Sequence, residues 1–180
     1  KYWFDEPAAT GNHGHEMTFW SENHQVLFHS SQFLVGQLFP DDVFPRSGTT
    51  ATGQPVTGRE HRARGSERLE RWLDHRLAFG FSEWCSPGYY NEDFPPVLNV
   101  VDFSLDERLA TKAAMVADLL VFDLARNTCR GSFGVTAGRA YFEGKAYGWG
   151  QSVSEAIELL LGARKDHLRG ADTTIAPCTP

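Results

Sequence analysis

Apolar residues recur at the spacing of an amphipathic helix in several segments of the chain. The clearest segment is 104–127, where residues three or four apart mark one face: Leu109, Ala113, Val116, Leu120 and Leu124. A second apolar row, typical of a helix packed between neighbours, is formed by Met115, Leu119 and Phe122. The pattern predicts a buried helix, and the spacing of Ser104 and Glu107 predicts a capping box at its start.

The same spacing predicts three more helices, over 21–38, 57–79 and 152–161. A shorter helix is expected within 89–103, where Pro95 and Pro96 suit a first turn. Gly, Pro and small polar residues predict loops over 1–18 and 40–58, and a loop or a short hairpin over 130–150. Clean alternation of apolar and polar residues is nearly absent, so we expect an all-α fold of antiparallel helical hairpins joined by long loops.

Composition narrows the class of protein. A chain of 180 residues with 41% hydrophobic and 22% charged residues predicts a single globular domain spanning 1–180. The net charge of −6 lacks the basic footprint of a nucleic-acid binder. No apolar run approaches the roughly 20 residues of a membrane span, so neither nucleic acid nor membrane is expected as a partner. The abrupt start and end of the sequence predict an excerpt of a longer protein.

Cysteine and histidine spacing predicts neither a metal nor a cofactor. Three widely spaced cysteines, Cys85, Cys129 and Cys178, match no zinc pattern, and a single disulfide among them would leave one free thiol. Histidines cluster near the N-terminus, but His24 and His29 are five residues apart and do not share a helix face. A metal-dependent enzyme using the N-terminal histidines is therefore only a third hypothesis.

Two short segments carry the candidate chemistry: Trp20-Ser21-Glu22-Asn23-His24 and Gly80-Phe81-Ser82-Glu83-Trp84. Each places a Ser-Glu pair beside an aromatic residue at an expected helix start. Glu22 and Glu83 are the candidate catalytic pair, because glycoside hydrolysis uses two carboxyl groups. Glu92 and Asp93 are alternative acids. The competing interpretation is that both glutamates only complement helix dipoles.

A second chemistry is open to the same residues. Asn23 and His24 could neutralise the carboxylate of an acidic sugar and remove its α-proton, with Tyr89 or Tyr90 as the proton donor. A structural role for His24 is the alternative. Trp20 and Trp84 are expected to stack on sugar rings, with Asn23 and Tyr90 also binding substrate. We expect these side chains to gather around one concave surface, since helix starts in a hairpin array open toward the same side.

These two segments, with Ser86-Pro87-Gly88-Tyr89-Tyr90, resemble those of the six-hairpin α/α toroid superfamily of glycoside hydrolases and polysaccharide lyases. The resemblance covers about residues 18–162 and implies part of a toroid whose funnel binds an oligo- or polysaccharide. It implies cleavage of a glycan by hydrolysis or by lyase-type elimination, with the remainder of a longer chain completing the ring. The alternative is a non-catalytic helical scaffold or binding module, because a fold does not fix a function.

Overall fold

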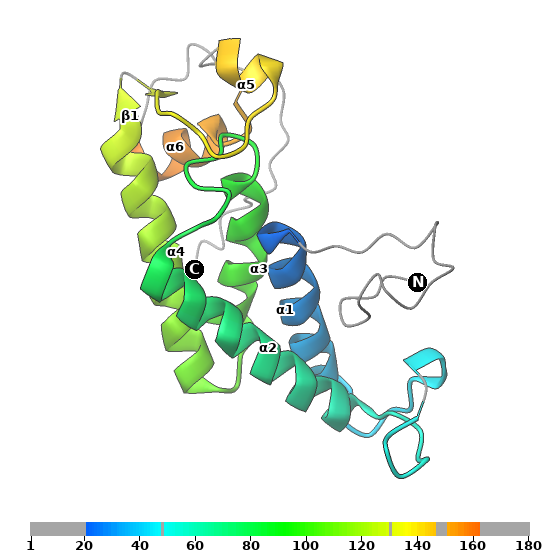
Figure 1. Ribbon diagram of the computed structural model, residues 1–180. Coiled ribbons are helices and arrows are strands. Elements are labelled where there is room, and N and C mark those ends of the chain that lie inside the picture. Colours follow the sequence, from blue (N-terminus) through cyan, green and yellow to red (C-terminus); the bar gives the residue numbers. More distant parts are fainter. Residues whose placement is uncertain (1–20, 48, 130, 147–150, 163–180) are drawn as a thin grey trace.

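The structure is a computed structural model and describes residues 21–47, 49–129, 131–146 and 151–162 (Figure 1). It contains six α-helices within these ranges: α1 (Glu22–Leu38), α2 (Gly58–Phe79), α3 (Tyr90–Phe103), α4 (Glu107–Asn127), α5 (Phe142–Ala146) and α6 (Ser154–Leu161). A short 3-10 turn, η1 (Pro45–Ser47), lies between α1 and α2, and strands β1 (Thr128–Cys129) and β2 (Ser132–Phe133) form the one small sheet of the described residues. The predicted all-α fold is confirmed.

Helices α1 and α2 form an antiparallel hairpin. The start of α1 meets the end of α2 where Glu22 pairs with Arg76, and the middle of α1 meets the first half of α2 where Phe33 lies against Gly65. A Cβ atom on Gly65 would come within 2.6 Å of the Phe33 nitrogen, so glycine permits this close approach of two backbones.

Helices α3 and α4 form a second antiparallel hairpin beside the first (Figure 1). The Tyr90 hydroxyl at the start of α3 donates to Asp123 near the end of α4. The two hairpins are joined at their other end by Gln37, whose side chain donates to the Phe103 carbonyl and accepts from the Leu105 amide, both at 2.8 Å. Antiparallel hairpins are thus confirmed, whereas the full toroid stays a prediction.

The helix starts differ from the expected ones in two places. The cap of α4 is Asp106, whose side chain accepts the amides of Arg108 and Leu109, so the capping box predicted from Ser104 is wrong. Helix α3 begins at Tyr90, which places Pro95 and Pro96 inside the helix and not in its first turn. Because proline has no N–H, the carbonyls one turn earlier receive no helical hydrogen bond from these two positions.

The core lies between the two hairpins and under α6. The predicted face of α4 is confirmed, since its members are fully buried: Leu109, Ala113, Val116, Leu120 and Leu124. The second predicted face is not covered, because Met115 and Phe122 are 51% and 57% exposed. Only Leu119 of that row packs against the core. The helix is therefore buried along one stripe.

The architecture brings three chain segments to one end of the hairpins. Helices α1 and α3 begin there, and the 80–89 connection and the 134–146 segment lie beside them (Figure 1). In the described part of the chain, no helix is long and apolar enough to cross a membrane.

Candidate functional site

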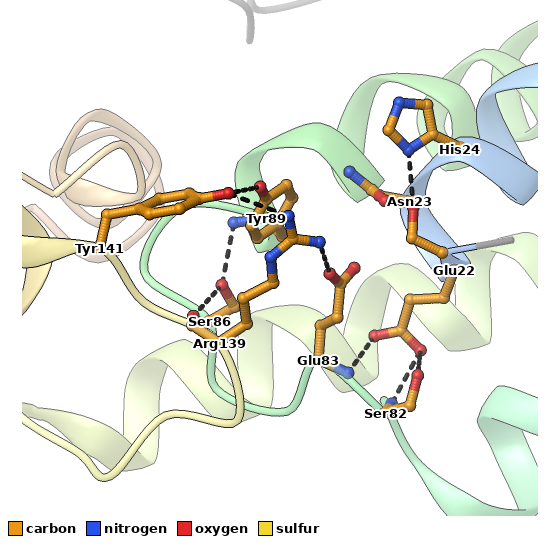
Figure 2. Close-up of polar contacts among 10 residues, drawn as sticks. Glu22, Asn23, His24, Ser82, Glu83, Ser86, Tyr89, Arg139 and Tyr141 are labelled. Atoms are coloured by element: carbon orange, nitrogen blue, oxygen red, sulfur yellow. Dashed lines mark hydrogen bonds and ion pairs between the residues drawn. The ribbon is translucent and has the colours of Figure 1, made fainter. Parts of the chain in front are cut away.

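The Glu22 carboxylate lies at the first residue of α1 and holds the turn that contains Ser82 and Glu83. Its oxygens accept hydrogen bonds from the Ser82 amide at 2.8 Å, the Ser82 hydroxyl at 2.7 Å and the Glu83 amide at 2.6 Å (Figure 2). Arg76, in the last turn of α2, pairs with the same carboxylate. The structure therefore brings the two acidic segments together, with Glu22 as a buried anchor whose two oxygens are both bound.

Arg76 is buried together with Glu22, with side-chain exposures of 7% and 3%. Its guanidinium lies 5.1 Å from the Trp72 ring centre and 6.0 Å from that of Phe81. The Trp72 indole donates to the Glu22 carbonyl at 3.0 Å. Charge pairing, cation–π contact and hydrogen bonds thus fix the start of α1 against the end of α2.

Glu83 faces away from this anchor toward the 134–146 segment (Figure 2). One carboxylate oxygen accepts from Arg139 at 2.7 Å, and the side chain is only 12% exposed. Its second oxygen is buried and has no hydrogen-bond partner among the described residues. Glu83 thus has an oxygen that the described residues leave unsatisfied, whereas both oxygens of Glu22 are bound.

Arg139 joins Glu83 to a pair of tyrosines. The hydroxyl groups of Tyr89 and Tyr141 are 2.7 Å apart, and Arg139 donates to Tyr141 at 2.9 Å. The guanidinium lies 4.2 Å from the centre of the Tyr89 ring. Figure 2 shows the chain of polar contacts from Tyr141 through Arg139 to Glu83 and on to Glu22.

The pKa values of the two phenols shift in opposite directions. Burial, followed by the hydrogen bond with Tyr141, raises the pKa of Tyr89 to about 12. The hydrogen bond with Tyr89, followed by that from Arg139, lowers the pKa of Tyr141 below its usual value. Either hydroxyl can be the donor of the bond between them, and a directly bonded pair of phenols with different pKa values is suited to proton transfer.

A pocket of about 140 Å³ opens beside the tyrosine pair. Its walls include Tyr89, Arg139 and Tyr141, together with Ser86 and Gln151. A pocket wall with one guanidinium and two phenol groups offers hydrogen bonds and positive charge to a polar, anionic ligand.

Short hydrogen bonds hold the 134–146 segment against the 80–89 connection. The Ser86 hydroxyl donates to the Arg139 carbonyl at 2.7 Å, and the Gly138 amide donates to the Trp84 carbonyl at 2.9 Å. A Cβ atom on Gly138 would lie 2.6 Å from Cδ1 of Trp84, so the indole packs directly on this glycine. Trp84 is nevertheless 48% exposed and presents a ring surface near Glu83.

Asn23 and His24 lie in the first turn of α1, on the other side of Glu83 from Tyr141 in Figure 2. The Ser21 hydroxyl lies 2.6 Å from Oδ1 of Asn23 and 2.6 Å from Nδ1 of His24. Ser21 stands at the N-cap position of α1, but its side chain orders Asn23 and His24 and makes no capping hydrogen bond. Asn23 is buried, and His24 is partly exposed.

Tyr90, expected to bind substrate, lies in the core. Its ring is fully buried, and its hydroxyl accepts from the Cys85 amide at 2.8 Å and donates to Asp123 at 3.0 Å. Burial raises the pKa of this phenol above its usual value. Tyr90 offers no surface to a ligand and supports the 80–89 connection. Trp20, the other expected sugar-binding residue, lies outside the described residues.

Sequence reasoning missed the two residues that complete the site, Arg139 and Tyr141. Both fall in the 130–150 stretch, which has no helical periodicity, and a single arginine near aromatic residues carries no spacing signal. The Ser82-Glu83 pair is also not a helix start, because it forms a turn that precedes α3.

Metal ligation is not evident in this region. Among the described residues, no group of three His, Cys, Asp or Glu side chains is placed to hold a metal ion. His13 and His15 lie outside them. Cys85 and Cys129 are free thiols, Cys85 buried and Cys129 exposed.

Comparison of the chain with models of protein families, with curated proteins and with solved structures finds no match. The function is therefore argued from the site itself.

Proposed function

We propose that the chain belongs to a carbohydrate-active enzyme that cleaves an acidic glycan by β-elimination at the site formed by Glu83, Tyr89, Arg139 and Tyr141. The observation that supports this proposal most is the contact between the two phenols, 2.7 Å apart, with the Arg139 guanidinium against both. Acid–base chemistry needs one group that gives up its proton readily and one that keeps it, and these two tyrosines differ in that way.

Each phenol takes one half of the reaction. The Tyr141 phenolate removes the proton on the carbon next to the sugar carboxylate, and that electron pair forms the carbon–carbon double bond as the glycosidic carbon–oxygen bond breaks. Tyr89 donates its proton to the departing oxygen. Tyr141 then carries the extra proton and Tyr89 lacks one, so a transfer across their hydrogen bond restores both groups.

Arg139 and Trp84 supply binding. The Arg139 guanidinium, whose side chain is 42% exposed, is the cation next to the pocket that can approach a sugar carboxylate and stabilise the negative charge that develops on it. Glu83 holds the guanidinium from its other side. The exposed ring of Trp84 suits the apolar face of a neighbouring sugar unit.

Hydrolysis by Glu22 and Glu83 is less well supported. A two-carboxyl mechanism needs both groups to reach the glycosidic bond or its water, whereas both oxygens of Glu22 are occupied by donors from the protein. A non-catalytic binding module is the second candidate. The observation that favours it is the structural role of Glu22, which was predicted to be catalytic.

Incubation of the protein with acidic and neutral polysaccharides tests the proposal. Elimination creates a conjugated double bond, so near-ultraviolet absorbance should rise with acidic glycans alone. Tyr141→Phe and Tyr89→Phe should each lower the rate by about 100-fold or more, which is typical for loss of a proton-transfer group. Thr136→Ala is the control, because it removes an exposed hydroxyl from the same segment as Arg139.

The other outcomes would refute elimination in different ways. New reducing ends without absorbance would identify a hydrolase. Binding of the glycan without any cleavage would support the binding module. Full activity of Tyr141→Phe would remove the tyrosine pair from the mechanism.

A further inference from the structure

Asp93 is a buried carboxyl group that the proposed reaction does not use. It lies in the first turn of α3, its exposed fraction is 0%, and neither of its oxygens has a hydrogen-bond partner among the described residues. Buried carboxyl groups are almost always paired with a cation or bound by several donors. Among the described residues, Asp93 has neither a paired cation nor a hydrogen-bond donor.

The charged groups around Asp93 come from every neighbouring element. Glu22 from α1, Arg76 from α2 and Glu83 from the 82–85 turn act on it, together with Glu92 of its own helix. Burial, followed by repulsion from Glu22 and Glu83, raises the pKa of Asp93 well above its usual value, and Arg76 only partly opposes this.

Arg76, the cation that acts on Asp93, is already paired with Glu22, and Arg139 is paired with Glu83. Ionisation of Asp93 would therefore add a negative charge to a desolvated region in which no described cation is paired with it. The favoured states are those in which Asp93 is uncharged or in which one of its acidic neighbours moves away.

Glu83 is the neighbour that can move. Both oxygens of Glu22 are held by donors, whereas the Glu83 side chain is held by Arg139 through one oxygen and its other oxygen is unpaired among the described residues. Rotation of that side chain toward solvent would relieve the repulsion at the expense of its pair with Arg139.

We propose that Asp93 is a positioning residue of the site: its uncharged carboxyl group allows Glu83 to stay bound to Arg139, and loss of the Asp93 proton displaces Glu83 from Arg139. The proton passes to solvent. Because Arg139 also binds Tyr141 and stacks on Tyr89, its release would alter the tyrosine pair as well. The inference concerns the site of the proposed function, but its test uses no substrate, so either proposal can fail without the other.

The fluorescence of Trp84 provides the test, because this half-exposed indole directly follows Glu83 and packs on the segment that carries Arg139. In the wild type, the fluorescence should change as the pH rises through the raised pKa of Asp93, above the usual range of a carboxyl group. A Trp84→Phe variant identifies the part of the signal that comes from this residue. In Asp93→Asn, which keeps the shape without the ionisation, the Trp84 signal should no longer depend on pH.

The pH dependence of protein stability provides a second test of the Asp93 proposal. The folded state holds the Asp93 proton more tightly than the unfolded state, whose carboxyl has a pKa of about 3.9. The wild type should therefore lose stability as pH rises above that value, until the folded-state pKa is reached. The urea midpoint of Asp93→Asn should rise relative to wild type over the same range. Asp93→Ser serves the same comparison if the asparagine variant folds poorly.

Asp102→Asn is the matched control, because it removes an exposed acidic charge from the far end of the same helix and should leave both pH dependences unchanged. Three results would overturn the inference: a wild-type Trp84 signal that does not depend on pH, a pH dependence that persists in Asp93→Asn, or an equal effect of Asp102→Asn. A pH dependence lost only with the Asp93 substitutions would support it.

Discussion

The Glu22 carboxylate accepts the backbone N–H of Glu83 at 2.6 Å. Two glutamates separated by 61 residues in the chain are thereby placed side by side with different roles. Glu22 has a structural role, since its carboxylate oxygens bind Ser82, Glu83 and Arg76. Glu83 has an oxygen without a hydrogen-bond partner in the described part of the chain, and Arg139 connects it to the tyrosine pair.

Loss of Glu22 should destabilise the fold strongly. Glu22→Ala leaves the Arg76 charge buried without a partner and frees the Ser82–Glu83 turn, so we expect a loss of about 3 to 5 kcal/mol in the free energy of unfolding, measured with urea. The control is Glu67→Ala, which breaks a surface pair with Arg71 whose side chains are 71% and 70% exposed. That change should be within about 0.5 kcal/mol. Equal effects of the two substitutions would mean that the buried pair is not a stabilising anchor.

The pH dependence of cleavage should follow Tyr141. In the proposed elimination the Tyr141 phenolate is the base, so the rate should rise with pH as Tyr141 ionises, below the usual tyrosine pKa of about 10. Tyr89 must keep its proton, and its pKa of about 12 leaves it protonated over that range. Arg139→Gln should move the rising limb to higher pH because it removes one of the hydrogen bonds that lower the Tyr141 pKa.

Arg59→Gln is the control for that profile. Arg59 forms an exposed pair with Asp41 far from the site, so its substitution should leave the rising limb in place. If the rising limb of the pH–rate profile stays unchanged in Arg139→Gln, Arg139 does not lower the pKa of Tyr141.

Substitution of Gly138 should weaken glycan binding. The added Cβ of Gly138→Ala would come within 2.6 Å of the Trp84 ring and 3.2 Å of the Ser82 carbonyl, so the indole and the segment carrying Arg139 must shift. We expect a higher KM or Kd for the glycan. Gly134→Ala is the matched control, since an added Cβ there meets no atom within 4 Å. If both variants bind equally well, the packing of Trp84 on Gly138 has no part in recognition.

The buried face of α4 should contribute more to the stability of the protein than the exposed face of the same helix. Leu120→Ala removes a fully buried side chain and should lower the free energy of unfolding by about 2 to 5 kcal/mol. Met115→Ala, at a position that is 51% exposed, should have a much smaller effect on the same helix. Thermal or urea unfolding of the two variants makes the comparison, and a larger loss from Met115→Ala would reverse the assignment of the two faces.

The helices could be predicted from the sequence because helical periodicity is a local property. The second apolar face of α4 could not be judged in this way, since the pattern marks Met115 and Phe122 as apolar without saying whether another element covers them. The α4 cap was misassigned for a related reason: both Ser104 and Asp106 are good capping residues, and only the backbone geometry selects Asp106.

The site was predicted in part. The sequence indicated that the segments around Glu22 and Glu83 would meet, and they do. It could not indicate that Glu22 would bind the turn of Glu83 itself, because side-chain contacts with backbone amides leave no pattern in a sequence. Arg139 and Tyr141 were missed since their place beside Tyr89 depends on how the 134–146 segment folds back.

The pairing of Glu83 with Arg139 spans 56 residues, and that of Glu22 with the Glu83 amide spans 61. The α1–α2 hairpin can begin to form at its loop, where Gly58 lies against Phe39, 19 residues earlier, whereas the contacts of the site require longer segments to close. During refolding, helical circular dichroism should therefore recover before the Trp84 environment does. We expect the site to acquire its structure after the helices among which it lies.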